Sequence, residues 1–103
     1  MQRFFILLFI FVNYSVINAQ GSLPPGQYTS TNKKAIKLYE EGKKCYEVRK
    51  DTDAEKLLNK ALNEDNNFIE AHSALAYLLM EKRRIPEAIT HFQKAIEVNP
   101  KFF

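Results

Sequence analysis

The sequence has few residues of the types that cross-link a small domain, bind a metal or form a recognisable motif. Among its 103 residues there are one cysteine, two histidines, three glycines and no tryptophan. A lone cysteine cannot close a disulfide within the chain, and two histidines make at best a poor metal site, so neither route can stabilise the fold. A glycine-rich phosphate loop, a nucleophile elbow and the usual metal-ligand spacings are all missing. We therefore expect no enzymatic activity, no cofactor and no bound metal.

The sequence also lacks a large excess of charge of one sign. Fifteen Lys and Arg residues against twelve Asp and Glu leave a net charge of +3, which is too small to indicate nucleic-acid binding. Lys82, Arg83 and Arg84 form a basic cluster, which we interpret as a solvated rim, with a phosphate-binding site as the alternative. With 46% hydrophobic and 26% charged residues, the composition is that of one small domain.

The longest hydrophobic run lies at the N-terminus. Arg3 precedes an uninterrupted apolar stretch over residues 4–12, which is the pattern of a secretory signal peptide. The run is shorter than the roughly 20 apolar residues that a transmembrane helix needs. Because Ala19 offers a small side chain before Gln20, we expect a signal peptide over 1–19, with an uncleaved signal anchor as the alternative. No transmembrane span is expected after cleavage.

Residues 20–32 are rich in Gly, Pro, Ser and Thr. Such a stretch neither forms a helix nor buries a face, so it predicts a flexible linker. Tyr28 is its one large aromatic residue, and we expect the ring to pack on the first helix.

Residues 33–103 repeat with a period of 34. A shift of 34 positions places Ala54 on Ala88 and Ala61 on Ala95. Apolar residues at helical spacing predict an all-α fold of paired helices, at 33–49, 53–65, 68–83 and 86–98.

The residues between the predicted helices are typical of helix ends. Thr52 with Glu55, and Asn67 with Glu70, have the spacing of capping boxes. Pro86 suits the first turn of the last helix. These signals support two helical hairpins.

The 34-residue period and its pattern of small and apolar positions resemble the tetratricopeptide repeat. The resemblance implies a solenoid fragment of two repeats: a degenerate unit at 33–66, a second unit at 67–100, and the start of a truncated third unit at 101–103. His72 stands where the family has Trp. The positions that carry the repeat packing are Gly42, Ala54, Ala61, Leu75, Ala76, Ala88, Phe92, Ala95 and Pro100.

The same resemblance implies that a protein or peptide partner binds in the concave groove made by the first helix of each unit. The residues expected to face it are Ile36, Tyr39, Lys43, Tyr46, Glu70, Ser73, Tyr77 and Met80. The alternative is that the tyrosines only complete the packing. Cys45 is expected to be a buried thiol, and His72 and His91 are too far apart in the register to assume a shared metal.

Signal peptide, linker and repeats together resemble the N-terminal region of bacterial envelope proteins that carry an outer-membrane-protein-A-type C-terminal domain. This implies an exported scaffold in the periplasm or at the outer membrane, with peptidoglycan or outer-membrane association through a domain beyond Phe103. The alternative is a regulatory or noncatalytic repeat domain of a longer enzyme that continues after Phe103.

Overall fold

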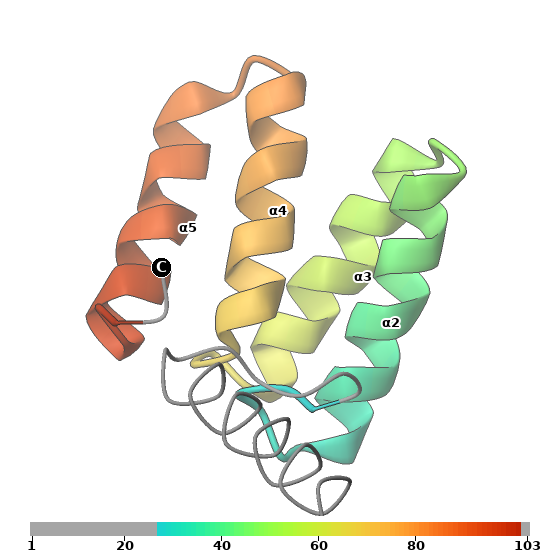
Figure 1. Ribbon diagram of the computed structural model, residues 1–103. Helices are drawn as coiled ribbons and strands as arrows, with labels where there is room; N and C mark the ends of the chain where they lie inside the picture. Colours follow the sequence, from blue (N-terminus) through green and yellow to red (C-terminus); the bar gives the residue numbers. More distant parts are fainter. Residues whose placement is uncertain (1–26, 102–103) are drawn as a thin grey trace, which may run out of the picture. The chain divides into compact units, whose positions relative to one another are not determined.

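The computed structural model describes residues 27–101, of which Tyr28–Pro100 form one compact unit. The first hairpin consists of α2 (Lys33–Glu47) and α3 (Asp51–Glu64), and the second of α4 (Ile69–Glu81) and α5 (Ile85–Val98) (Figure 1). Each pair packs side by side, and α4 also contacts α2 and α3. The four helices confirm the predicted all-α fold, and their ends lie within two residues of the predicted ones. The predicted signal peptide and residues 102–103 lie outside the described residues.

The two hairpin turns share one backbone geometry. Arg49 and Arg83 have φ values of 60° and 64°, in the left-handed region that ends many helices. In each turn the residue after the arginine donates its amide hydrogen to the carbonyl oxygen five residues earlier, as Lys50 does to Cys45 at 2.8 Å. Since the two arginines are 34 residues apart, the backbone repeats with the period of the sequence.

Both predicted capping boxes are wrong. Helix α3 begins at Asp51, one residue before Thr52, and α4 begins at Ile69. In neither helix does the side chain of the preceding residue accept a capping hydrogen bond. The two glutamates of the predicted boxes bind elsewhere, Glu55 to Lys82 and Glu70 to Thr29. Helix α2 is capped locally, because the side chain of Asn32 accepts a hydrogen bond from the amide of Ala35 at 2.9 Å.

The last part of the predicted linker, residues 28–32, packs on the helices. The Thr29 hydroxyl accepts a hydrogen bond from the Ile69 amide at 3.1 Å, so it caps α4 from 40 residues away. The same residue donates to the Glu70 carboxylate through its amide, at 2.8 Å, and through its hydroxyl. As expected, the Tyr28 ring packs edge-on against Tyr39 of α2, with ring centroids 5.3 Å apart.

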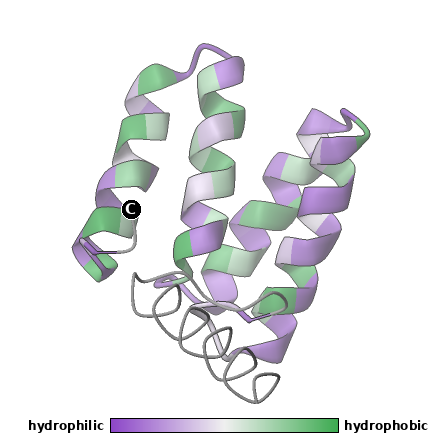
Figure 2. Cartoon of the chain, in the orientation of Figure 1, coloured by the Kyte–Doolittle hydropathy of each residue, from purple (hydrophilic) through white to green (hydrophobic). Residues whose placement is uncertain are grey.

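Small residues allow the helices to approach closely. Ala54, Ala61, Ala76, Ala88 and Ala95 are each at most 1% exposed, as is expected where two helix axes come close. In Figure 2 hydrophobic and hydrophilic segments alternate along the helices. The largest fully buried side chains are Phe68, Leu58, Ile69, Leu75, Leu78 and Leu79.

Candidate functional site

A cavity of about 290 Å³ lies between the first helices of the two hairpins. Helix α2 supplies three lining residues, α4 supplies two, and α3 supplies one at the base. The lining residues are Tyr39, Lys43, Tyr46, Leu58, Ala74 and Tyr77. The cavity therefore brings together four of the eight residues that the repeat register assigned to the groove, including all three tyrosines.

Tyr39 forms the closed side of the cavity. Its side chain is 7% exposed, and burial raises the pKa of its hydroxyl to about 12, with smaller contributions from Tyr28, Glu70 and Glu40. The ammonium of Lys43 lies 5.6 Å from the centroid of the Tyr39 ring, within the range of a cation–π contact. The wall is therefore an uncharged aromatic surface with one cation beside it.

Tyr46 lines the cavity and links α2 to α4. Its hydroxyl donates to the carboxylate of Glu81, a hydrogen bond that raises the pKa of the tyrosine. The Arg49 guanidinium lies 5.0 Å from the centroid of the same ring and donates to Glu81 at 2.8 Å. These polar contacts restrain the Tyr46 ring at its place in the cavity lining.

Tyr77 is the exposed residue of the set. Its side chain is 56% exposed, and its ring meets Phe92 of α5 edge-on with centroids 5.2 Å apart. A partly exposed, supported aromatic ring offers contact area at a low entropic cost to a ligand. Tyr77 is therefore the most accessible of the three tyrosine rings that line the cavity.

The other four predicted groove residues do not line this cavity. Ile36 packs against the core cluster, and Glu70 is bound to Thr29. The Ser73 hydroxyl is buried without a hydrogen-bond partner. Met80 is 44% exposed on α4.

Two lining residues were not predicted, Leu58 and Ala74. A Cβ atom added at Gly42 would come within 3.1 Å of the Leu58 side chain, so the glycine gives Leu58 room where it lines the cavity. The sequence pattern indicates Gly42 as a packing position and not as part of a groove. Ala74 lies one turn before Tyr77 on α4, where its small side chain leaves the space open.

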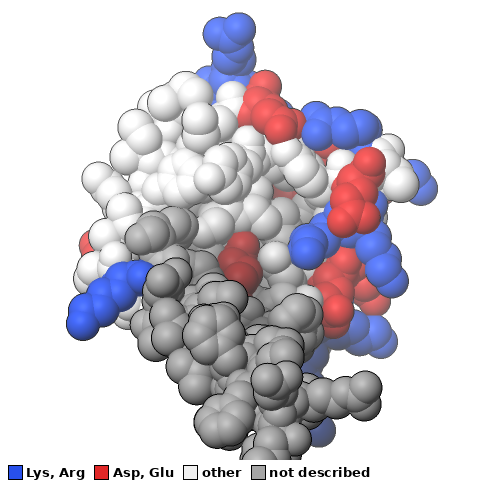
Figure 3. Space-filling model, viewed as in Figure 1, with Lys and Arg blue, Asp and Glu red and all other residues white. Residues whose placement is uncertain are grey.

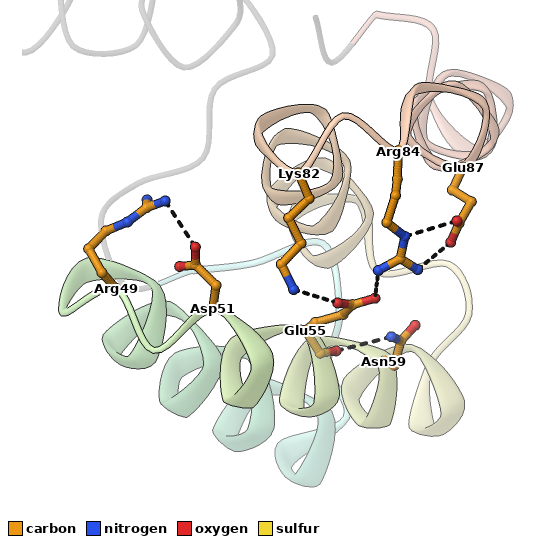
Figure 4. Close-up of polar contacts among 7 residues, drawn as sticks. All are labelled: Arg49, Asp51, Glu55, Asn59, Lys82, Arg84 and Glu87. Carbon is orange, nitrogen blue, oxygen red and sulfur yellow. Dashed lines mark hydrogen bonds and ion pairs between the residues drawn. The ribbon is translucent and has the colours of Figure 1, made fainter.

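In the basic cluster at the last turn, Arg83 is exposed as expected for a solvated rim, whereas Lys82 and Arg84 form ion pairs. Lys82 and Arg84 both bind the Glu55 carboxylate of α3, at 2.9 and 2.6 Å, and Arg84 also pairs with Glu87 (Figure 4). The Glu55 side chain is 19% exposed. Two of the three charges therefore connect the hairpins and are not free for a phosphate.

The Glu55 cluster predicts an acid-sensitive contribution to stability. Burial raises the pKa of the Glu55 carboxyl, but the hydrogen bonds from Lys82 and Arg84 outweigh burial and hold the pKa below its ordinary value of 4.5. The contribution is thus complete above the unfolded-state pKa and is lost as the pH falls through the folded-state value. In urea melts from about pH 5 to pH 3, we expect Glu55→Gln to lose less stability than the wild type. Equal losses would contradict the assignment, and Glu47→Gln, at an exposed site, is the control.

The separation assumed for the two histidines is wrong. His72 of α4 and His91 of α5 lie with their Nδ1 atoms 3.0 Å apart. They are 19 residues apart in the chain, and only the packing of α5 on α4 brings them together.

The remaining positions lie mostly where packing requires. Gly42 and Leu75 are buried, Phe92 and Cys45 are partly buried, and Pro100 is exposed after α5. The outer side of α5 carries exposed apolar residues, among them Ile89 at 49% and Ile96 at 50%. In the view of Figure 3 the surface over the second hairpin is largely uncharged, while the charges gather mainly over the first.

Two stacked helical hairpins with a groove between their first helices define a helical-repeat fold. Residues 69–102 match the family model described as Tetratricopeptide repeat, which spans α4 and α5. Repeats of this kind generally mediate contacts between proteins and are typically noncatalytic. No curated protein matches the chain. A bilayer-spanning helix, which would need at least 18 residues of sustained apolar character, does not occur between residues 27 and 101.

Proposed function

We propose that this chain binds a protein partner through the cavity lined by Tyr39, Lys43, Tyr46 and Tyr77. The observation that carries the proposal is the cavity itself, because its walls are aromatic and aliphatic and one cation stands at its edge. Apolar concave surfaces with a few placed polar groups are the usual form of a binding site. Aromatic residues are also the commonest anchors of protein interfaces.

The chemistry of the lining suggests the kind of ligand. An apolar side chain of the partner enters between the tyrosine rings, and a neighbouring carboxylate pairs with Lys43. The Arg49 guanidinium beside Tyr46 already pairs with Glu81, at 2.8 Å, and with Asp51, at 3.0 Å, so its charge is not free for the ligand. A short segment with an apolar residue next to an acidic one fits this surface best.

We also propose that the protein is exported and acts as a scaffold in the assembly of a bacterial cell-envelope complex. The support is the sequence of residues 1–19, where one arginine precedes an apolar run and Ala19 offers a cleavage site. A reporter enzyme that folds only after export, fused behind residue 32, tests this proposal. Equal reporter activity from a fusion that lacks residues 4–12 would contradict export.

Replacing Tyr77 with Ala tests the groove. A peptide selected from a random displayed library serves as the probe, and its dissociation constant is measured by calorimetry. We expect Tyr77→Ala to weaken binding by at least about 10-fold, because its ring is the most accessible of the three tyrosine rings.

The matched control is Ile96→Ala, which truncates a 50% exposed apolar residue on α5, outside the cavity lining. We expect this variant to bind like the wild type. Failure to select any peptide, or equal weakening by both variants, would refute the groove as the binding site. Circular dichroism of both variants checks that the helices remain folded.

A further inference from the structure

The two histidines of the chain meet at one point between α4 and α5. His72 lies in the first turns of α4 and is 3% exposed, while His91 lies in the middle of α5 and is partly exposed. Their Nδ1 atoms are 3.0 Å apart and their ring centroids 5.3 Å apart. Neither residue takes part in the groove.

The backbone fixes the tautomer of His72. Its Nε2 atom lies 2.7 Å from the carbonyl oxygen of Asn66, which can only accept a hydrogen bond. Nε2 therefore carries the proton, and Nδ1 presents a lone pair toward His91. When both rings are neutral, the Nδ1–H of His91 donates to that lone pair.

This arrangement has the two features of a histidine metal ligand. Metal-bound histidines usually donate their second ring N–H to a backbone carbonyl or a carboxylate, as His72 does to Asn66. Two nitrogens bound to one metal ion at 2.0–2.1 Å lie about 2.9 Å apart at a right angle and about 3.3 Å apart in tetrahedral geometry. The observed separation of 3.0 Å lies within this range.

We propose that His72 and His91 bind one divalent first-row metal ion, such as Zn²⁺, through their Nδ1 atoms. On binding, the Nδ1 proton of His91 moves to its Nε2 atom, and the two rings turn so that their lone pairs meet at the ion. His91, which is partly exposed, is the ring with room to turn. Among residues 27–101 no group of three or more His, Cys, Asp or Glu side chains could hold a metal, so water completes the coordination.

The surroundings favour the neutral imidazoles that a metal requires. Burial lowers the pKa of both histidines, and the charge of His72 would lower that of His91 further. The charge of Lys94 lowers the pKa of His72, and that of Asp65 raises it. Glu87, one turn before His91 on α5, raises the pKa of His91. Glu87 is itself paired with Arg84, so it does not approach as a ligand. The ion would tie α4 to α5 within the second hairpin.

The test is a thermal melt of the whole chain, purified without a polyhistidine tag, with and without Zn²⁺. At ten times the dissociation constant we expect the melting temperature to rise by about 6–11 °C. Mg²⁺, which prefers oxygen ligands, should cause no shift. Nitrogen NMR of the rings is a second readout, because the Nδ1 resonances of both histidines should move together with added Zn²⁺.

The decisive variant is His91→Asn, whose amide can still donate to Nδ1 of His72 but brings no imidazole. We expect it to fold and to lose the Zn²⁺ shift. Cys45→Ser, which removes the only thiol, should keep the shift. No shift in the wild type, or a shift that His91→Asn retains, would overturn the proposal.

Discussion

Replacing Phe68 with Ala should cost about 3–5 kcal/mol of folding free energy, the largest loss expected from any single substitution considered. Phe68 is 0% exposed. It directly precedes α4 and joins three segments, which are α4, α2 and the packed residues 28–32. Its ring centroid is 5.0 Å from that of Tyr39 on α2 and 5.9 Å from that of Tyr28 in the packed segment before it. Truncation therefore leaves a cavity and removes two aromatic contacts at once.

Such a loss is a large part of the total stability of a small domain, which is roughly 5–15 kcal/mol. Urea unfolding followed by circular dichroism measures the change. Because Phe68→Ala could fail to fold, Phe68→Leu is the second variant, and we expect it to cost about 1.5 kcal/mol or less since most of the apolar volume stays.

Phe92→Ala is the matched control for Phe68→Ala. Phe92 is only partly buried and makes one edge contact, with Tyr77. We expect it to cost clearly less than Phe68→Ala. Equal costs would mean that Phe68 does not join the three segments as described.

The sequence predicted the helices well because helix formation follows a local period. The 34-residue spacing placed all four helices within two residues, and the same spacing recurs in the left-handed turns at Arg49 and Arg83. The buried alanines were predicted for the same reason, since a small residue at a helix crossing stands out against larger apolar neighbours.

Contacts between segments far apart in the sequence were not predictable from the sequence pattern. Thr29 caps α4 from 40 residues away, Glu55 binds Lys82 from 27 residues away, and His72 meets His91 across two helices. Local reasoning assigned a local partner to Glu55 and none to the others. Each of these pairings depends on how one helix lies on another, which the period does not determine.

Only half of the predicted groove residues line the cavity, for a related reason. The repeat register pairs equivalent positions, so Lys43 with Tyr77 and Tyr46 with Met80 were assigned together. The cavity lies between α2 and α4, however, and of these two equivalent pairs only Lys43 with Tyr77 lines it on both sides. Tyr46 faces α4 and lines the cavity, whereas Met80 does not.

The double replacement Ala54→Leu with Ala88→Leu should cost about 2–6 kcal/mol, the second large effect. Each residue is at most 1% exposed where helices come close, so an isobutyl group forces the helix axes apart, at about 1–3 kcal/mol per site. Because one site lies in the first hairpin and the other in the second, we expect the two costs to add.

Gln93→Leu is the control, because it adds the same side chain at an exposed site of α5 and should change stability by no more than about 0.5 kcal/mol. The single variants are the more informative pair. Ala88 lies within the matched residues 69–102, and Ala54 lies 34 residues before it, outside them. If Ala54→Leu costs as much as Ala88→Leu, the first hairpin packs as a repeat of the same kind. If Ala54→Leu is neutral while Ala88→Leu is costly, the 34-residue register does not hold for the first hairpin.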